Sequence, residues 1–172
     1  MYAKRSVSTR IAKYLFVVII FMGIISSLSL IVMASNKSDA EAINISGSLR
    51  MQSYRLLTEM ERSPDTVEQN LVRYQDSLNA HVLLTVQNQL FAPSGIKASY
   101  QKILQRWMMM SDLASSHQIE KYHAELKSYV QDVDDFVLEL QRFAEKKWII
   151  AVSVLCISML LILAMVSYVI WY

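Results

Sequence analysis

Residues 43–60 place a charged side chain on a helix face whose spacing suits contact with another helix. Five residues of that face recur at steps of four, three, four and three: Ile43, Gly47, Arg50, Tyr54 and Leu57. In such a seam an arginine loses hydration, at a cost of several kcal/mol unless an anion meets it. No acidic residue lies within one turn of Arg50 on this stripe. Arg50 is therefore a candidate anion-binding residue, and Gly47 would let backbone approach the anion closely.

Pairing of two copies of this helix about a twofold axis would bring the two Arg50 side chains face to face. Like charges held in this way favour an anion between them. Two alternatives stay open from spacing alone: Arg50 reaches out to water, or it pairs with a distant Asp or Glu. A second stripe is predicted to face the core and comprises Ile45, Leu49, Leu56 and Met60.

The same stretch contains the word GSLRMQSYRL, within residues 39–56. It resembles the signature helix of bacterial nitrate/nitrite sensor histidine kinases of the narQ type. The resemblance implies that a homodimer binds one nitrate between two copies of this helix, with Arg50 as the nitrate-binding arginine and Gly47 beside the ligand. Met51, Tyr54 and Arg55 are further motif residues. Pilus-linked chemotaxis receptors share a weaker form of the motif.

Arg55 follows Arg50 by five residues, which turns it roughly 140° round the helix. Arg55 therefore faces a different direction from Arg50, and we expect it to form an ion pair within the bundle.

Composition favours long helices. The 172 residues include three glycines and two prolines, too few for a β-rich or loop-rich architecture. The one cysteine, Cys156, lies in an apolar run, so no disulfide framework is expected. The length leaves room for one modest domain beside membrane segments.

Two charge-free runs, residues 14–33 and 148–172, are each long enough to cross a bilayer as a helix. A signal peptide cleaved near residues 32–34 is a weaker reading of the first run, which exceeds the usual apolar length. Residues 1–13 carry four basic and no acidic side chains, which predicts a cytoplasmic N-terminus. Residues 34–147 then form the extracytoplasmic domain, and Lys146 and Lys147 at its edge are expected to reach lipid headgroups.

Residues 34–147 are predicted to form an antiparallel four-helix bundle, which makes the fold class all-α. The first helix continues to residue 62, and Ser63 is expected to cap the next, with Pro64 in its first turn. Apolar stripes mark the second, third and fourth helices: Val67, Leu71, Tyr74, Leu78 and Val82; Ile96, Tyr100, Ile103, Trp107 and Met110; Ile119, Tyr122, Leu126, Tyr129, Val133, Phe136, Leu140 and Phe143. The last register continues into residues 148–172, which predicts one long helix, although a bundle helix followed by a plain anchor has the same periodicity.

Other candidate sites are weaker. His81, His117 and His123 share no i,i+4 spacing, so neither a metal nor another cofactor is expected. Residues 107–110, Trp-Met-Met-Met, are better explained by core packing than by soft-metal binding. Asp132, Asp134 and Asp135 lack the glycine turn of a calcium loop and are expected on a solvated face.

No catalytic constellation is visible in the 172 residues, although full-length members of the resembled family are protein histidine kinases. The family's relay helices and kinase core would follow residue 172, so a downstream kinase region or a response regulator is the expected output. The prediction is a dimeric sensor of nitrate or nitrite in the bacterial inner membrane, with its sensor domain in the periplasm and no nucleic-acid partner. The alternatives are the ligand-binding portion of a chemotaxis-type receptor and a structural membrane bundle that senses nothing.

Overall fold

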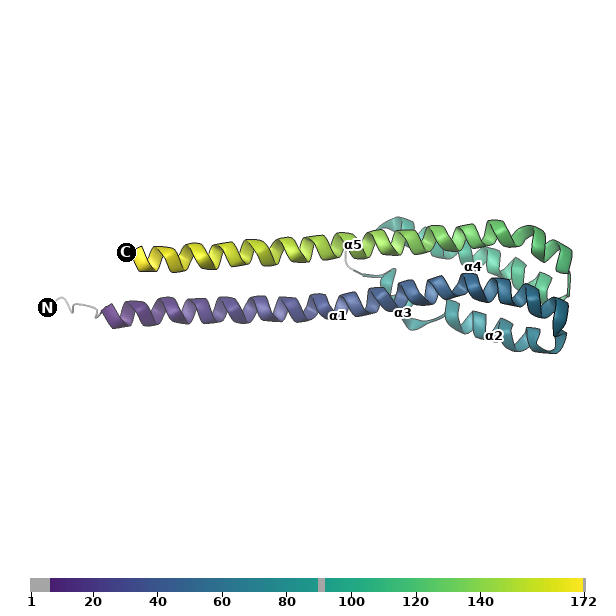
Figure 1. Ribbon diagram of the computed structural model, residues 1–172, viewed down its shortest axis with the longest axis horizontal. Coiled ribbons are helices and arrows are strands. Elements are labelled where there is room, and N and C mark those ends of the chain that lie inside the picture. The colour runs from purple at the N-terminus through teal and green to yellow at the C-terminus, as the bar shows by residue number, and fades with distance from the viewer. Residues whose placement is uncertain (1–6, 90–91, 172) are drawn as a thin grey trace. The chain divides into compact units, whose positions relative to one another are not determined.

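The computed structural model describes residues 7–89 and 92–171, and every regular element among them is helical. In chain order the elements are α1 (Val7–Arg62), the 3₁₀ turn η1 (Pro64–Thr66), α2 (Val67–Leu78), α3 (His81–Val86), α4 (Ser94–Ser115) and α5 (Ile119–Trp171) (Figure 1). The predicted all-α class is confirmed, and so is the continuation of the last bundle helix into the second apolar run. The basic residues Lys4 and Arg5 and the terminal Tyr172 lie outside the described residues.

The chain divides into two compact units, and α1 and α5 contribute to both. One unit combines Met1–Asn36 with Lys146–Tyr172, and the other is Lys37–Glu145. In the first unit both helices are long and apolar enough to cross a membrane, and their apolar side chains are largely exposed. Lipid is the surrounding that suits such a surface. Within this unit Lys147 Nζ donates to Ser35 Oγ at 3.1 Å, which joins the two helices.

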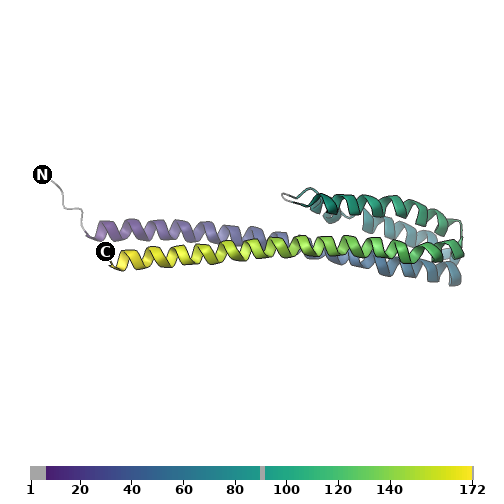
Figure 2. The same ribbon diagram turned by 90° about the horizontal axis from the view of Figure 1, so that it is seen from above.

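The second unit is the helical bundle, in which α1, α2, α4 and α5 lie side by side (Figures 1 and 2). The predicted apolar stripes of α2, α4 and α5 are buried as expected, except for Ile119, which is only partly buried. Alternating three- and four-residue steps keep one face of each helix towards the others, so burial of these faces supplies the main driving force for the bundle.

The predicted second helix is broken. α2 ends at Leu78, Ala80 adopts an extended backbone (φ −54°, ψ 130°), and a new helix α3 starts at His81. Val82, predicted to continue the stripe of α2, is buried from α3. The break leaves the carbonyl oxygen of Leu78 open to a side chain, and the Tyr100 hydroxyl donates to it at 2.7 Å. The hydrogen bond with a buried tyrosine compensates for the interrupted helix ladder.

Two helix ends also differ from the prediction. Ser63 lies before η1, but its side chain makes no capping hydrogen bond, and the Thr66 hydroxyl donates to the Ser63 carbonyl instead. α4 continues to Ser115, five residues beyond Met110, the last residue of the stripe predicted for this helix. His117 then reverses the chain with a positive φ of 53°, a region that histidine tolerates better than β-branched residues.

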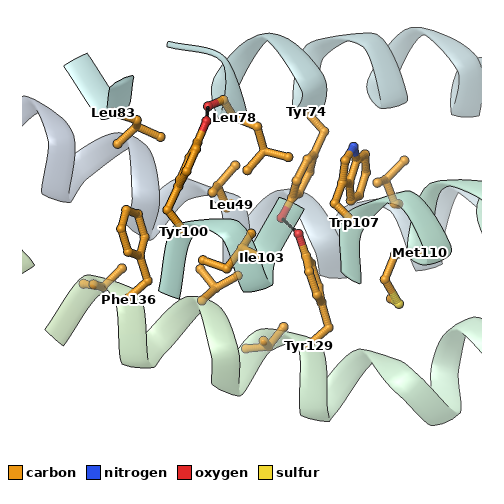
Figure 3. Packing of buried hydrophobic residues seen from close by; sticks show 14 of the residues in the cluster. Leu49, Tyr74, Leu78, Leu83, Tyr100, Ile103, Trp107, Met110, Tyr129 and Phe136 are labelled. Atoms are coloured by element: carbon orange, nitrogen blue, oxygen red, sulfur yellow. Dashed lines mark hydrogen bonds between the residues drawn. The ribbon is translucent and has the colours of Figure 1, made fainter. Parts of the chain in front are cut away.

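Aromatic residues fill the centre of the bundle (Figure 3). The rings of Tyr74 and Trp107 stack at 3.7 Å with planes 13° apart, which joins α2 to α4. The Trp107 Nε1 donates to Gln75 Oε1 at 2.8 Å, so the indole is buried with its polar atom paired. The prediction that the Trp107 region serves core packing is confirmed for Trp107 and Met110, whereas Met108 and Met109 are exposed.

Candidate functional site

α1 directs a row of small and apolar side chains into the bundle: Ala42, Ser46, Leu49, Ser53, Leu56 and Met60. The hydroxyls of Ser46 and Ser53 donate to backbone oxygens one turn earlier, at 2.7 and 2.8 Å. Their polar atoms are therefore paired within the helix, and their small size lets neighbouring helices approach. Ile45, predicted to belong to this row, is only partly buried because the row follows Ser46 instead.

The motif face of α1, formed by Arg50, Met51 and Tyr54, points away from the core of its own chain. Arg50 and Tyr54 are exposed, and Met51 beside them is 68% exposed. Ile43 and Leu57, at the two ends of the stripe, are partly buried against the core. Arg50, Met51 and Tyr54 thus form an open surface of one arginine and two large apolar side chains.

Arg50 has a counter-ion from another helix. Its Nη1 donates to Asp134 Oδ1 of α5 at 2.8 Å, and its Nε lies 3.4 Å from the Gly47 carbonyl oxygen. The side chains of Arg50 and Asp134 are 47% and 37% exposed, so water screens the pair and its contribution to stability is about 0–1 kcal/mol. Within one chain, the alternative in which Arg50 pairs with a distant acid is realised.

Gly47 leaves room for the Arg50 guanidinium. A Cβ atom built on Gly47 would meet Arg50 Nη2 at 3.8 Å, an ordinary contact distance. A methyl group would therefore fit the fold, but it would occupy the space directly beside the guanidinium. The two motif residues lie together, as the sequence spacing predicts.

Arg55 forms the ion pair expected of it, with a local partner. Its Nε contacts Glu59 Oε1 at 2.6 Å, one turn further along α1. The other oxygen of Glu59 accepts a hydrogen bond from Asn70 Nδ2 of α2. Arg55 therefore supports the packing of α1 on α2, on a different side of the helix from Arg50.

Asp132 is not on a solvated face, contrary to the prediction. It is 7% exposed, and its two oxygens contact Lys102 Nζ at 2.7 Å and Arg106 Nη1 at 2.8 Å, both from α4. Burial alone would raise the pKa of the Asp132 carboxyl, but hydrogen bonds from Lys102 and Arg106 and their positive charges lower it below its ordinary value. Sequence inspection missed this cluster because its cations come from a separate helix.

A buried chain of hydroxyl groups lies behind the motif face. Tyr74 and Tyr129 share a hydrogen bond of 2.8 Å (Figure 3). The Ser53 hydroxyl donates to the Tyr74 hydroxyl at 3.3 Å. The Tyr122 hydroxyl donates to the Ser53 carbonyl at 3.0 Å. Ser53, three residues from Arg50, is therefore tied to α2 and α5 from the core side, which holds this part of α1 in register.

Among the residues that the structure describes, no group of three His, Cys, Asp or Glu side chains could hold a metal ion. His81 Nδ1 lies 3.3 Å from the Thr85 hydroxyl one turn further along α3, and His117 lies at the turn before α5.

Comparison with known proteins places the chain in a family. Residues 31–129 match the model of the type IV pili methyl-accepting chemotaxis transducer N-terminal domain, PilJ. The chain belongs to this family. The matched PilJ segment contains the whole motif face of α1 and extends into α5 as far as Tyr129.

Two curated relatives of this PilJ-family chain are sensor proteins. It is 64% identical over all 172 residues to the "Sensor protein NarQ homolog" of Haemophilus influenzae, of which it covers 30%. It is 34% identical over 154 residues, 90% of the chain, to the "Nitrate/nitrite sensor protein NarQ" of Escherichia coli, of which it covers 27%. The chain thus spans less than a third of the length of these relatives. The matches confirm the resemblance to a narQ-type sensor portion, and with the two apolar helices they indicate a membrane protein of signal transduction.

Proposed function

We propose that this chain is the sensor portion of a dimeric nitrate/nitrite receptor, in which one anion binds between the Arg50 side chains of two copies. The observation that carries the proposal is the placement of Arg50 beside Gly47 on an open face of α1, held by a half-exposed ion pair. The name of the Escherichia coli relative, a nitrate/nitrite sensor protein, supplies the ligand class.

The chemistry of Arg50 suits a small planar oxyanion. A guanidinium offers N–H donors in a rigid fork, and two forks facing each other can bond the oxygens of one nitrate from both sides. Two positive charges brought together across a twofold axis repel, and a monovalent anion between them removes that repulsion. Binding of the anion and pairing of the chains are then mutually dependent.

The surface round Arg50 suits a second copy of the chain. Met51 and Tyr54 are large, exposed and next to Arg50, and aromatic residues, methionine and arginine are the types enriched at protein interfaces. A symmetric contact through this face would cover these side chains and bring the two Gly47 backbones near the anion. Cross-linking through a cysteine at Leu57, in a Cys156→Ser background, should trap a symmetric dimer in membranes.

The contact between Asp134 and Arg50 would couple anion binding to the packing of α1 against α5. An anion that takes the Nη1 donor of Arg50 would displace the Asp134 carboxylate and break the ionic contact between α1 and α5. The two packings of α1 against α5 would then differ in anion affinity, and the ligand would shift the population towards the one in which Arg50 is free. A displacement of α1 relative to α5 would pass the signal across the membrane to a kinase region or response regulator.

The proposed setting is the bacterial inner membrane, with residues 34–147 in the periplasm. A reporter that is active only outside the cytoplasm should work when fused after Pro93 and fail at residue 2. The reverse pattern would contradict the sensor's location.

A chemotaxis-type receptor is the second candidate, because the family description names chemotaxis transducers. Its ligand domain would share this architecture and differ in the cytoplasmic output. The gene region following residue 172 distinguishes the two: relay helices and a kinase core support the sensor kinase, and a methyl-accepting signalling hairpin supports the receptor.

Thermal melting of the purified dimer tests the anion site. Nitrate should raise the melting midpoint of the wild type, because a ligand that binds the folded dimer stabilises it by mass action. The rise should vanish in Arg50→Ala, and in Arg50→Lys, which keeps the charge but loses the fork. A nitrate-dependent rise of wild-type size in Arg50→Ala would contradict the proposal.

A further inference from the structure

The acidic residues of α5 bind two different helices at one level of the bundle. Asp134 pairs with Arg50 of α1, whereas Asp132 pairs with Lys102 and Arg106 of α4. Residues two apart on a helix point about 200° apart, so the two carboxylates lie on nearly opposite sides of α5. α5 is therefore held between α1 and α4 by ionic contacts on both sides.

The contact with α4 is the firmer of the two. Arg106 bonds three residues of α5: Asp132 Oδ2 and Ser128 Oγ, each at 2.8 Å, and Glu125 Oε2 at 2.9 Å. One guanidinium thus spans two turns of α5, and the Arg106 side chain is only 21% exposed. The Arg50–Asp134 pair is a single contact between half-exposed groups, which water screens.

Rotation of α5 about its axis would affect both contacts together. A turn that carries Asp134 away from Arg50 would also draw Asp132 out of its position between Lys102 and Arg106. Because Asp132 is nearly fully buried, separating it from both cations leaves an uncompensated charge, a strongly unfavourable state. The α4 contacts therefore resist the rotation, and the α1 contact is the one free to open.

We propose that Asp132 is a positioning residue for anion sensing: held by Lys102 and Arg106, it fixes the rotation of α5 that keeps Asp134 within reach of Arg50. Through this contact it sets how strongly Asp134 competes with the anion, and hence the nitrate concentration at which the sensor responds. The inference rests on the proposed function of Arg50.

Loosening α5 from α4 should make nitrate bind more tightly. When Asp134 leaves Arg50 more often, a larger fraction of Arg50 is free to bind, and the apparent dissociation constant falls in proportion. The increase in nitrate affinity cannot exceed the increase obtained by removing the Asp134 carboxylate itself. Loss of an exposed ion pair such as Arg50–Asp134 should lower the dissociation constant for nitrate by about 1.5-fold to fivefold.

Calorimetric titration of the membrane-embedded dimer with nitrate tests the proposal. Asp132→Asn should lower the dissociation constant by about 1.5-fold to fivefold. In an Asp134→Asn background the same substitution should have no further effect, because the competitor is already gone. A purely structural role for Asp132 would weaken binding or leave it unchanged, and it would act equally in both backgrounds.

Control variants separate positioning from charge and from misfolding. Asp135→Asn removes the same charge from α5 at an exposed residue whose carboxylate accepts from Gln131, and it should keep the wild-type constant. Lys102→Met should shift the constant in the same direction as Asp132→Asn but less, because Arg106 still holds Asp132. Lys102→Arg should restore the wild-type value.

An unchanged or raised constant in both Asp132→Asn and Lys102→Met, in dimers that melt cooperatively, would overturn the positioning role and leave the Arg50 site intact. Equal tightening in Asp135→Asn would overturn it too, by assigning the effect to net charge. A wild-type dimer that binds no nitrate would instead overturn the proposed function, and this inference with it.

Discussion

Arg50 of α1 and Asp134 of α5, 84 residues apart in the sequence, are joined by a single contact of 2.8 Å between Nη1 and Oδ1. The pair supplies Arg50 with a counter-ion inside one chain, so the guanidinium is not stranded when no other anion is present. It is also exposed enough to be displaced. A nitrate ion that binds the Nη1 group of Arg50 therefore competes with the Asp134 carboxylate, whose attraction to Arg50 is weakened by water.

Asp134→Asn should strengthen nitrate binding. The amide keeps the size of the side chain but removes the charge that occupies Arg50, so the dissociation constant should fall by about 1.5-fold to fivefold. Titration of the dimer with nitrate measures the change. A weaker affinity would mean that Asp134 helps to hold the anion site together rather than competing for it.

Gly47→Ala should separate stability from binding. Alanine favours a helix over glycine by about 1 kcal/mol, and the added methyl meets Arg50 Nη2 at a tolerable 3.8 Å, so the melting midpoint should rise. Nitrate binding should weaken, because the methyl occupies the space beside the guanidinium. Binding of unaltered strength in this variant would show that the anion lies elsewhere.

Tyr74→Phe should destabilise the bundle through its buried hydroxyl chain. The substitution keeps the stack on Trp107 but leaves the buried Tyr129 hydroxyl without its partner at 2.8 Å. Such a loss costs about 1–3 kcal/mol, which lowers the melting midpoint of a chain of this size by roughly 2–12 °C. The matched control, Tyr54→Phe, removes an exposed hydroxyl and should leave the ligand-free midpoint unchanged.

Stability should fall at alkaline pH. Burial raises the pKa of Tyr74 to about 12, against the opposing effect of its hydrogen bonds with Ser53 and Tyr129, and burial also raises the pKa of Tyr122 and Tyr129. Since these values lie above the unfolded value of about 10, the neutral phenols stabilise the fold fully below pH 10. The contribution is lost as the pH rises from about 10 through the folded pKa values.

Melting midpoints between pH 8 and pH 11.5 check this dependence. The wild type should lose more stability over that interval than Tyr74→Phe, which has one raised phenol fewer. Parallel curves for the two proteins would show that Tyr74 ionises as easily in the folded state as in the unfolded one.

Periodicity predicted most of the fold because it reports burial directly. The seven residues of the α5 stripe from Tyr122 to Phe143 are all buried, as their spacing requires. The break at residues 79–80 escaped prediction, because Val82 fits the stripe of α2 by spacing although it belongs to α3. The break is stabilised by the hydrogen bond from Tyr100 of α4 to the Leu78 carbonyl, and a contact from another helix cannot be recognised in the sequence around the break.

The candidate site was predictable only in part, for a similar reason. The α1 sequence alone places Arg50 and Gly47 on one face, and the structure brings them together. The partner of Arg50 was not predictable, because three acids within four residues of α5 look alike in sequence. The structure distinguishes them by the helix that each meets: Asp132 meets α4, Asp134 meets α1, and Asp135 is exposed.

The number of nitrate ions bound per chain tests the central claim most directly. Calorimetric titration of the purified dimer should give one nitrate for two chains in the wild type and none in Arg50→Ala. The fold of that variant should stay within about 1 kcal/mol of the wild type, because Asp134 stays solvated when its partner is removed. One nitrate per chain, or binding that persists in Arg50→Ala, would contradict an anion shared between two Arg50 side chains.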